Sequence, residues 1–281
     1  MNTTTPLAEA RRAGEQSATE RILLASDGGH ASAAALRWVI ERVAHRSADV
    51  EIVNVSDPTA TDAAERRVRV GGMARVLTTI SPSVQVTVTD SVADPLELLA
   101  RAREDIVVVG AHRGDRKRTP FAEFAASRAE GPVVVVPSEW ICREGPVMVG
   151  VGAEDDVTAA LAFAEREAAA RGEDIRLIHA WQTTGLGEVP PAWDFGTESI
   201  PERQRRALER LAQLERESHP DVPLTSEAVQ GRVVARLTEA ARTASLLVVG
   251  RSHRNTVVRA MFGSTANGLL GTLPCPVAVI P

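Results

Sequence analysis

The sequence predicts an α/β protein made of two tandem, doubly wound domains, each a five-stranded parallel sheet in a three-layer α/β/α sandwich with flavodoxin-like strand order. Three observations lead to this prediction. The chain has 281 residues, which suits two domains of ordinary size. Short β-branched runs alternate with Ala- and Leu-rich stretches of helical period. The second part of the chain also repeats the pattern of the first.

The repeat divides the chain into two copies. The offset between matching residues is first 125, then 140 and finally 144, so most of the extra residues of the second copy fall around Gln182–Ile200, which we expect to be a long surface loop. The matching segments are 21–56 with 146–181, 106–110 with 246–250, and 132–137 with 276–281. We expect a mobile N-terminal tail at 1–19, a first domain at 20–138, a linker at 139–145 and a second domain at 146–281.

Each copy is expected to supply five strands. Their continuous apolar runs suit strands that are covered on both faces of a sheet. The expected strands of the first copy are Arg21–Ser26, Val50–Val55, Val84–Thr89, Ile106–Val109 and Val133–Val136. Those of the second copy are Val147–Val151, Ile175–Ala180, Leu224–Val229, Leu246–Val249 and Val277–Ile280.

The composition argues against several classes of function. Lys and Arg total 32 against 37 Asp and Glu, a net charge of −5, which disfavours a surface for DNA or anionic membranes. No run approaches the roughly 20 apolar residues that span a bilayer. Two cysteines, Cys142 and Cys275, suit neither a disulfide framework nor a cysteine zinc site. We therefore expect a cytoplasmic protein with no nucleic-acid or membrane partner.

Residues that suit ligand binding follow the strands, where a doubly wound sheet binds its ligand. Leu246–Val249 is followed by Gly250-Arg251-Ser252-His253, then by nine residues, and then by Gly263-Ser264-Thr265. Pro274–Pro281 closes the chain, and Ser26-Asp27-Gly28 opens the first copy. With these motifs the chain, from about residue 20 to its end, resembles a tandem universal stress protein. That resemblance implies a stress-response binding or signalling protein.

In the nucleotide-binding branch of that family, a glycine, two residues, a second glycine, nine residues and then Gly-Ser or Gly-Thr hold phosphate. Glycines expose backbone N–H groups to phosphate oxygens, and a helix N-terminus favours negative charge. The second copy keeps this spacing, with His253 at the second glycine and Gly152 at the family's aspartate. The resemblance thus implies an ATP site, with Mg²⁺ only as the counterion of ATP. Its residues would be Val151, Gly152, Ala180, Val249, Gly250, Arg251, Ser252, His253, Gly263, Ser264 and Thr265.

The first copy departs from the motif at the opposite end. The nucleoside side of its site is matched by Ser26, Asp27, Val55 and Gly110. Arg113, however, replaces the second glycine, and Glu123 stands at the Gly-Ser step, where a carboxylate would repel phosphate. Asp27 is equally an ordinary turn and cap residue. An alternative function is therefore an interaction scaffold in which both sites are vestigial.

Other candidate residues favour neither catalysis nor a metal. Glu154-Asp155-Asp156 suits the positive end of a helix dipole as well as it suits magnesium. His112 and His253 lack a recognisably spaced nucleophile or acid, so we expect no enzyme, and slow ATP hydrolysis is the weakest of the alternatives. The resemblance implies that Val133–Val136 pairs with Val277–Ile280 as an internal pseudo-dimer. Further homodimerisation and an unidentified protein partner remain open.

Overall fold

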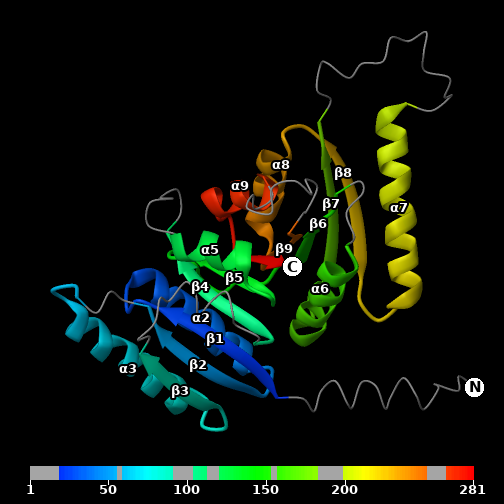
Figure 1. Ribbon diagram of the computed structural model, residues 1–281. Helices are drawn as coiled ribbons and strands as arrows, with labels where there is room; N and C mark the ends of the chain where they lie inside the picture. The colour runs from blue at the N-terminus through cyan, green and yellow to red at the C-terminus, as the bar shows by residue number, and fades with distance from the viewer. Residues whose placement is uncertain are drawn as a thin grey trace, which may run out of the picture.

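Ten strands form one continuous sheet that both halves of the chain share (Figure 1). The strand order is β3-β2-β1-β4-β5-β10-β9-β6-β7-β8. The computed structural model describes residues 19–55, 59–90, 104–112, 120–152, 157–182, 199–251 and 264–281. The N-terminal tail expected at 1–19 and the loop expected at 182–200 lie almost wholly outside the described residues.

All ten predicted strands are confirmed, each within two residues at either end. The strands are β1 Glu20–Ser26, β2 Ala48–Asn54, β3 Gln85–Asp90, β4 Ile106–Ala111, β5 Val133–Pro137, β6 Val147–Gly150, β7 Ile175–Trp181, β8 Leu224–Gln230, β9 Leu246–Gly250 and β10 Val277–Ile280. The helices are α2 His30–Val43, α3 Ala63–Ile80, α5 Pro120–Arg128, α6 Thr158–Arg171, α7 Ile200–Ser218, α8 Val233–Ala240 and α9 Ser264–Thr272, with a 3₁₀ turn at Ala241–Thr243.

The predicted flavodoxin-like strand order is wrong. Each half runs in the order third, second, first, fourth, fifth strand, so β2 and β4 flank β1 and β3 lies at the edge. The physical reason lies in the side chains. β4 begins with the apolar run Ile106–Val109, which is wholly buried beside β1, whereas β3 alternates polar and apolar residues and leaves Val88 42% exposed. A half-polar strand suits an edge and a continuous apolar strand suits the centre.

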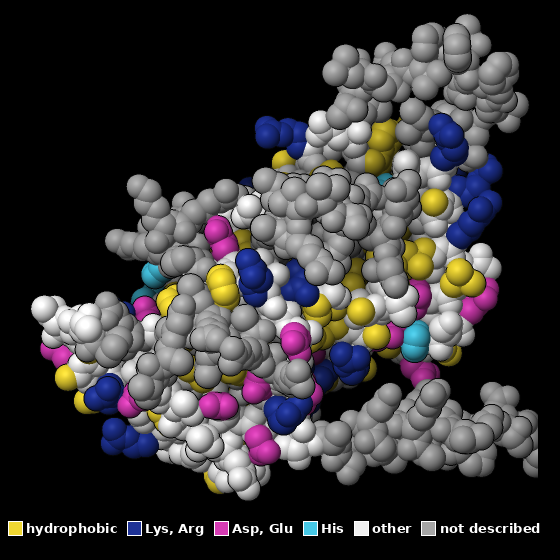
Figure 2. Space-filling view, in the orientation of Figure 1, with side chains coloured by type: hydrophobic (Ala, Val, Ile, Leu, Met, Phe, Trp, Pro, Cys, Tyr) yellow, Lys and Arg dark blue, Asp and Glu magenta, His cyan; other side chains and the backbone are white. Residues whose placement is uncertain are grey.

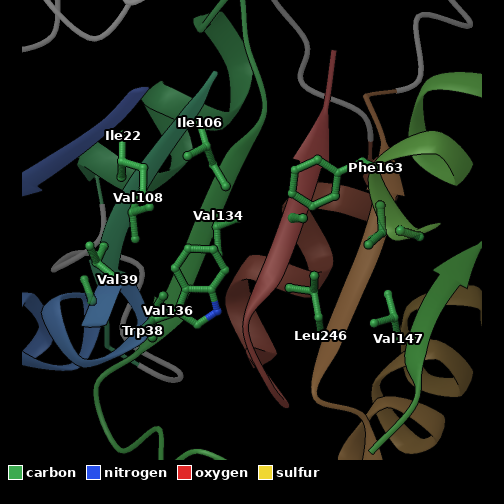
Figure 3. Close-up of a cluster of buried hydrophobic side chains, with 14 of the residues drawn as sticks. Ile22, Trp38, Val39, Ile106, Val108, Val134, Val136, Val147, Phe163 and Leu246 are labelled. Atoms are coloured by element: carbon green, nitrogen blue, oxygen red, sulfur yellow. The ribbon is translucent and has the colours of Figure 1, made fainter. Parts of the chain in front are cut away.

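Helices cover both faces of the sheet and complete the three predicted layers. α2, α3, α6 and α7 pack on one face, and α5, α8 and α9 pack on the other. Successive residues of β1 alternate between the faces, with Ile22 and Leu24 in one core and Leu23 in the other. Figure 3 shows the first core running across both halves, with Trp38 and Phe163, which hold the same place in the repeat, in one buried cluster.

The two halves join where β5 and β10 pair antiparallel. Val134 lies opposite Ala278, its own counterpart at an offset of 144, so the join follows a local two-fold symmetry. This confirms the expected pairing of Val133–Val136 with Val277–Ile280. Both strands are buried along their length. The pairing removes the two sheet edges that separate halves would expose.

A buried ion pair links the halves close to the same symmetry axis. Arg42 of α2 and Glu167 of α6 are counterparts at an offset of 125, and their side chains are 3% and 1% exposed. Nη1 of Arg42 donates to Oε2 of Glu167 at 2.5 Å, while Nε and Nη2 donate to the carboxylate of Glu20 at 2.6 and 2.7 Å. Burial raises the pKa of Glu167, but the charges of Arg42 and Arg46 outweigh burial and lower it.

This pair predicts strongly non-additive mutations. Arg42→Met or Glu167→Met alone removes the nearest partner of the other buried charge, which keeps only Arg46 and Arg171 or Glu20, and should lower the free energy of unfolding by about 3 kcal/mol. The double substitution removes both charges and should cost less than the sum of the single effects. Urea unfolding of the four proteins measures the coupling. Additive losses would show that the two charges do not depend on each other.

Candidate functional site

In the first half, Asp27 closes the turn that precedes α2. Its Oδ1 accepts hydrogen bonds from the backbone N–H of Gly29 at 2.8 Å and from Oγ of Ser32 at 2.7 Å. Its Oδ2 accepts a hydrogen bond from Nη1 of Arg66, a residue of α3, at 3.1 Å. Both carboxylate oxygens therefore already have partners within the same half. Asp27 thus stabilises the turn before α2, which is the structural alternative that the sequence left open for this residue.

Helix α3 also fills the space beside the end of β1. Nε of Arg69 donates to the carbonyl of Gly28 at 2.9 Å, and Oγ of Ser26 donates to Sδ of Met73 at 3.2 Å. Gly28 has a φ of +70°, and a Cβ there would meet the carbonyl oxygen of Arg66 at 2.9 Å. Only glycine suits both that conformation and that contact. Side chains of α3 thus contact the turn in which the nucleoside side of the first site was predicted.

The carboxyl end of β4 is closed by a different contact. A Cβ on Gly110 would lie 2.1 Å from the carbonyl oxygen of Ala31, so the start of α2 packs directly on this glycine. Val55 is buried, and its N–H donates to the carbonyl of Ser26 at 2.9 Å. The counterpart of Gly110 in the second half is Gly250, and a Cβ there would meet no described atom within 4 Å. The counterpart of Ala31 in the second half is Asp156, which lies outside the described residues.

In the second half, the strand order brings several predicted site residues to one edge. β6 lies between β9 and β7, so Gly250, Gly152 and Ala180 all lie at or just beyond the carboxyl ends of neighbouring strands. The preceding Val249 and Val151 belong to the same edge. Gly152 places no side chain in the position that Asp27 holds in the first half. Of the described residues at this edge, Gly152 and Gly250 carry no side chain.

His179 fixes the backbone of this edge. Its Nδ1 lies 2.8 Å from the carbonyl oxygen of Val151, and its Nε2 lies 2.9 Å from Oε1 of Gln204 in α7. The ring is buried, and both nitrogens are engaged. The sequence analysis did not select His179. Its place at the end of β7, just before Ala180, was the signal that could have identified it.

Arg251 extends from this edge to the first half. Its backbone N–H donates to the carbonyl of Ile280 at 2.6 Å, and its Nη1 donates to the carbonyl of Ala129, just beyond α5, at 2.8 Å. Burial lowers the pKa of the guanidinium. The counterpart of Arg251 in the first half is Ala111, which cannot make this contact. The side chain of Arg251 thus ties the end of β9 to the other half.

Several candidates lie outside the described residues. These are Ser252, His253, Gly263, Arg113 and the acidic run Glu154-Asp155-Asp156. Ser264 begins α9, but its side chain is not described. Thr265 is the second residue of the same helix. Glu123, which stands where the family has its Gly-Ser step, lies in the first turn of α5.

A cavity of about 730 Å³ lies between α8 and α9 and reaches the end of β7. Thr265 is the predicted site residue that lines this cavity. Arg232, which precedes α8, supplies a cation that the sequence analysis missed, although its place directly after β8 was a usable signal. The lining residues are Gln182, Arg232, Val233, Val234, Ala235, Thr238, Glu239, Arg242, Thr265 and Thr272.

Two further features concern the charge of the surface and the hydropathy of the helices. On the face drawn in Figure 2, basic and acidic side chains are interspersed. Across the described ranges, no helix is both long and apolar enough to cross a membrane.

Both the sequence and the fold are similar to those of known proteins. Residues 145–281 match the sequence model of the Universal stress protein family. A universal stress protein of Mycobacterium tuberculosis is 30% identical over 188 residues, 64% of this chain and 63% of that protein's length. A universal stress protein of Mycolicibacterium smegmatis is 28% identical over 94% of this chain and 98% of its own. A universal stress protein structure from Archaeoglobus fulgidus shares the fold, with a TM-score of 0.70 at 15% identity over 92% and 97% of the two chains.

The fold defines a tandem doubly wound α/β protein with one continuous sheet. Residues 145–281 form a universal stress protein domain, and the chain over most of its length is similar to universal stress proteins.

The Asp27 cluster predicts a pH-dependent contribution to stability. Burial raises the pKa of Asp27, but Ser32, Gly29 and Arg66 together lower it. A lowered folded-state pKa stabilises the fold above the unfolded value of about 3.9, and this stability is lost as pH falls through the folded value. Asp27→Asn should therefore cost about 1 kcal/mol or less at pH 7, because the site is partly exposed, and the difference should vanish in acid.

Urea unfolding between pH 7 and pH 2.5 measures this difference. The exposed Asp49→Asn in β2 is the control. A cost for Asp27→Asn that persists unchanged at the acid end would contradict the charged cap.

Proposed function

We propose that the chain is a cytoplasmic stress-response binding protein whose second half binds an adenine nucleotide, ATP with Mg²⁺ as its counterion. The asymmetry of the two edges supports this proposal most directly. Asp27 is already bonded to Arg66 of α3, whereas Gly152 stands at the corresponding position of the second half and the spacing from Gly250 to Gly263-Ser264 is kept there. We therefore assign the nucleotide site to the second half.

The cavity beside α9 supports the same proposal. A volume of about 730 Å³ lies within the range of small-molecule sites. Thr265 brings a hydroxyl from the first turn of α9, where free N–H groups favour phosphate. Arg232 adds a positive charge, and Gln182 adds an amide beside the end of β7. In this proposal the phosphates lie near α9, and the base lies near Ala180.

Residue roles follow from the retained spacing. The backbone N–H groups after Gly250 and Gly263 bind phosphate oxygens, and Ser264 donates a hydroxyl hydrogen bond. His253, at the second glycine, supplies an imidazole that contacts phosphate when protonated. Arg251 holds the loop in place through its bond to Ala129 and does not contact the nucleotide with its side chain.

Binding without hydrolysis fits the described part of the edge. His179 is the titratable side chain buried there, and its ring nitrogens are already engaged with Val151 and Gln204. A general base needs a free nitrogen or oxygen within reach of the attacking water. We therefore propose a nucleotide-binding protein with no enzymatic activity.

Thermal unfolding with and without millimolar ATP and magnesium tests the proposal, with GTP as the control nucleotide. A ligand at about 100 times its Kd should stabilise by roughly 2.7 kcal/mol. Gly263→Val should abolish the ATP shift, because a side chain would block the approach of phosphate. The matched control is Gly71→Val in α3, where a Cβ meets no neighbour, and it should keep the shift.

A non-nucleotide-binding interaction scaffold is the second candidate function. The filled cap around Asp27 favours it, because that half has already exchanged a ligand contact for internal hydrogen bonds. In the second half, Gly152 and His253 also depart from the family motif, which favours the same alternative there. An ATP shift that is absent, or that survives Gly263→Val unchanged, would favour the scaffold.

A further inference from the structure

Three side chains of metal-ligand type meet between α6 and α7, away from the proposed nucleotide edge. Glu165 comes from α6, Glu215 from the last turn of α7, and His219 from the residue that ends α7. One ligand atom of each lies within 4.8 Å of the other two. Nδ1 of His219 is 2.6 Å from Oε1 of Glu165 and 3.6 Å from Oε2 of Glu215. Figure 1 shows the two helices on the same side of the sheet.

The charges around this cluster leave it negative. The side chains of Glu165 and Glu215 are only 15% and 21% exposed, and one imidazole supplies at most one positive charge between them. Burial and the facing Glu215 raise the pKa of Glu165, against the opposing influence of His219 and Arg166. Within the described ranges, no arginine or lysine forms an ion pair with either carboxylate.

Two other carboxylates that are buried or half-buried have an arginine as their partner. Glu167 is paired with Arg42, and Asp27 is paired with Arg66. Next to the cluster, Arg216 turns away to Glu209 and to the carbonyl of Leu224. The cluster thus combines two facing carboxylates with an imidazole in place of a guanidinium. A bound cation would balance the negative charge that this combination keeps.

The donor set indicates which cation fits. One imidazole nitrogen with two carboxylate oxygens is a zinc-type set, whereas Mg²⁺ and Ca²⁺ prefer oxygen ligands alone. Zinc bonds of about 2.0–2.2 Å place tetrahedral ligand atoms about 3.3 Å apart. The distances of 2.6 and 3.6 Å from Nδ1 of His219 bracket that spacing. The side chain of His219 is 49% exposed, so an ion can enter from solvent.

We propose that Glu165, Glu215 and His219 bind a divalent transition-metal ion, best matched by Zn²⁺, which joins the C-terminal end of α7 to α6. Water completes the four-coordinate site. Among the described residues of α7, the fully buried apolar side chains are those of Leu208 and Ala212, toward its middle. The ion therefore holds the end of this helix, where apolar packing is weakest.

Calorimetric titration of the untagged, chelator-treated full chain with ZnCl₂ tests the site. All proteins carry Cys142→Ser, because that exposed thiol could bind zinc by itself. We expect one zinc ion per chain and a rise in the thermal midpoint. His219→Gln and Glu165→Gln should each weaken binding about tenfold or more, because each removes a ligand. Co²⁺ should give the intense visible absorption of a tetrahedral site, and His219→Gln should remove it.

His45→Gln is the matched control, since His45 is an exposed histidine just beyond α2. It should leave zinc affinity and the Co²⁺ spectrum unchanged. Absence of zinc binding would overturn the proposal, as would zinc binding that is equal in His219→Gln, Glu165→Gln and the parent. Tight binding of Mg²⁺ or Ca²⁺ in preference to Zn²⁺ would overturn the assignment of the metal. Because the three ligands are surface or half-buried groups, these outcomes do not depend on refolding of the core.

Discussion

The arrangement of the two halves depends on a guanidinium and a carboxylate that are buried against each other at corresponding positions of the repeat. Arg42 and Glu167 are counterparts, and two identical halves would bring like charges together here. Buried like charges are strongly unfavourable, whereas a matched pair is tolerated when its remaining hydrogen bonds are satisfied. Glu20 completes the bonds of Arg42, and Arg46 approaches Glu167. The pair therefore requires two different halves, even though the β5–β10 join alone would accept two alike.

The same divergence separates the two ligand edges. In the first half, Asp27 binds the turn before α2 and an arginine of α3, and the start of α2 closes on Gly110. In the second half, Gly152 replaces Asp27, and Arg251 connects the end of β9 to the end of α5 in the first half. The two halves thus use corresponding positions for different internal contacts.

The sequence predicted the strands well because the repeat gives each apolar run an independent second instance. The strand order was predicted wrongly, because the polar alternation of β3 was not compared with the continuous apolar run of β4. For Asp27, the sequence could not separate a cap from a ligand contact, because the deciding partner, Arg66, lies 39 residues away. The zinc-type cluster escaped notice for the same reason. Glu215 and His219 are four residues apart, but Glu165 comes from another helix.

We propose that only the second half binds a nucleotide. Equilibrium dialysis of the full chain against labelled ATP and magnesium counts the sites directly. The predicted result is one ATP per chain at saturation, unchanged by Arg66→Ala in the first half and lost with Gly263→Val in the second. Two ATP per chain, or a single site that responds to Arg66→Ala and not to Gly263→Val, would contradict the account.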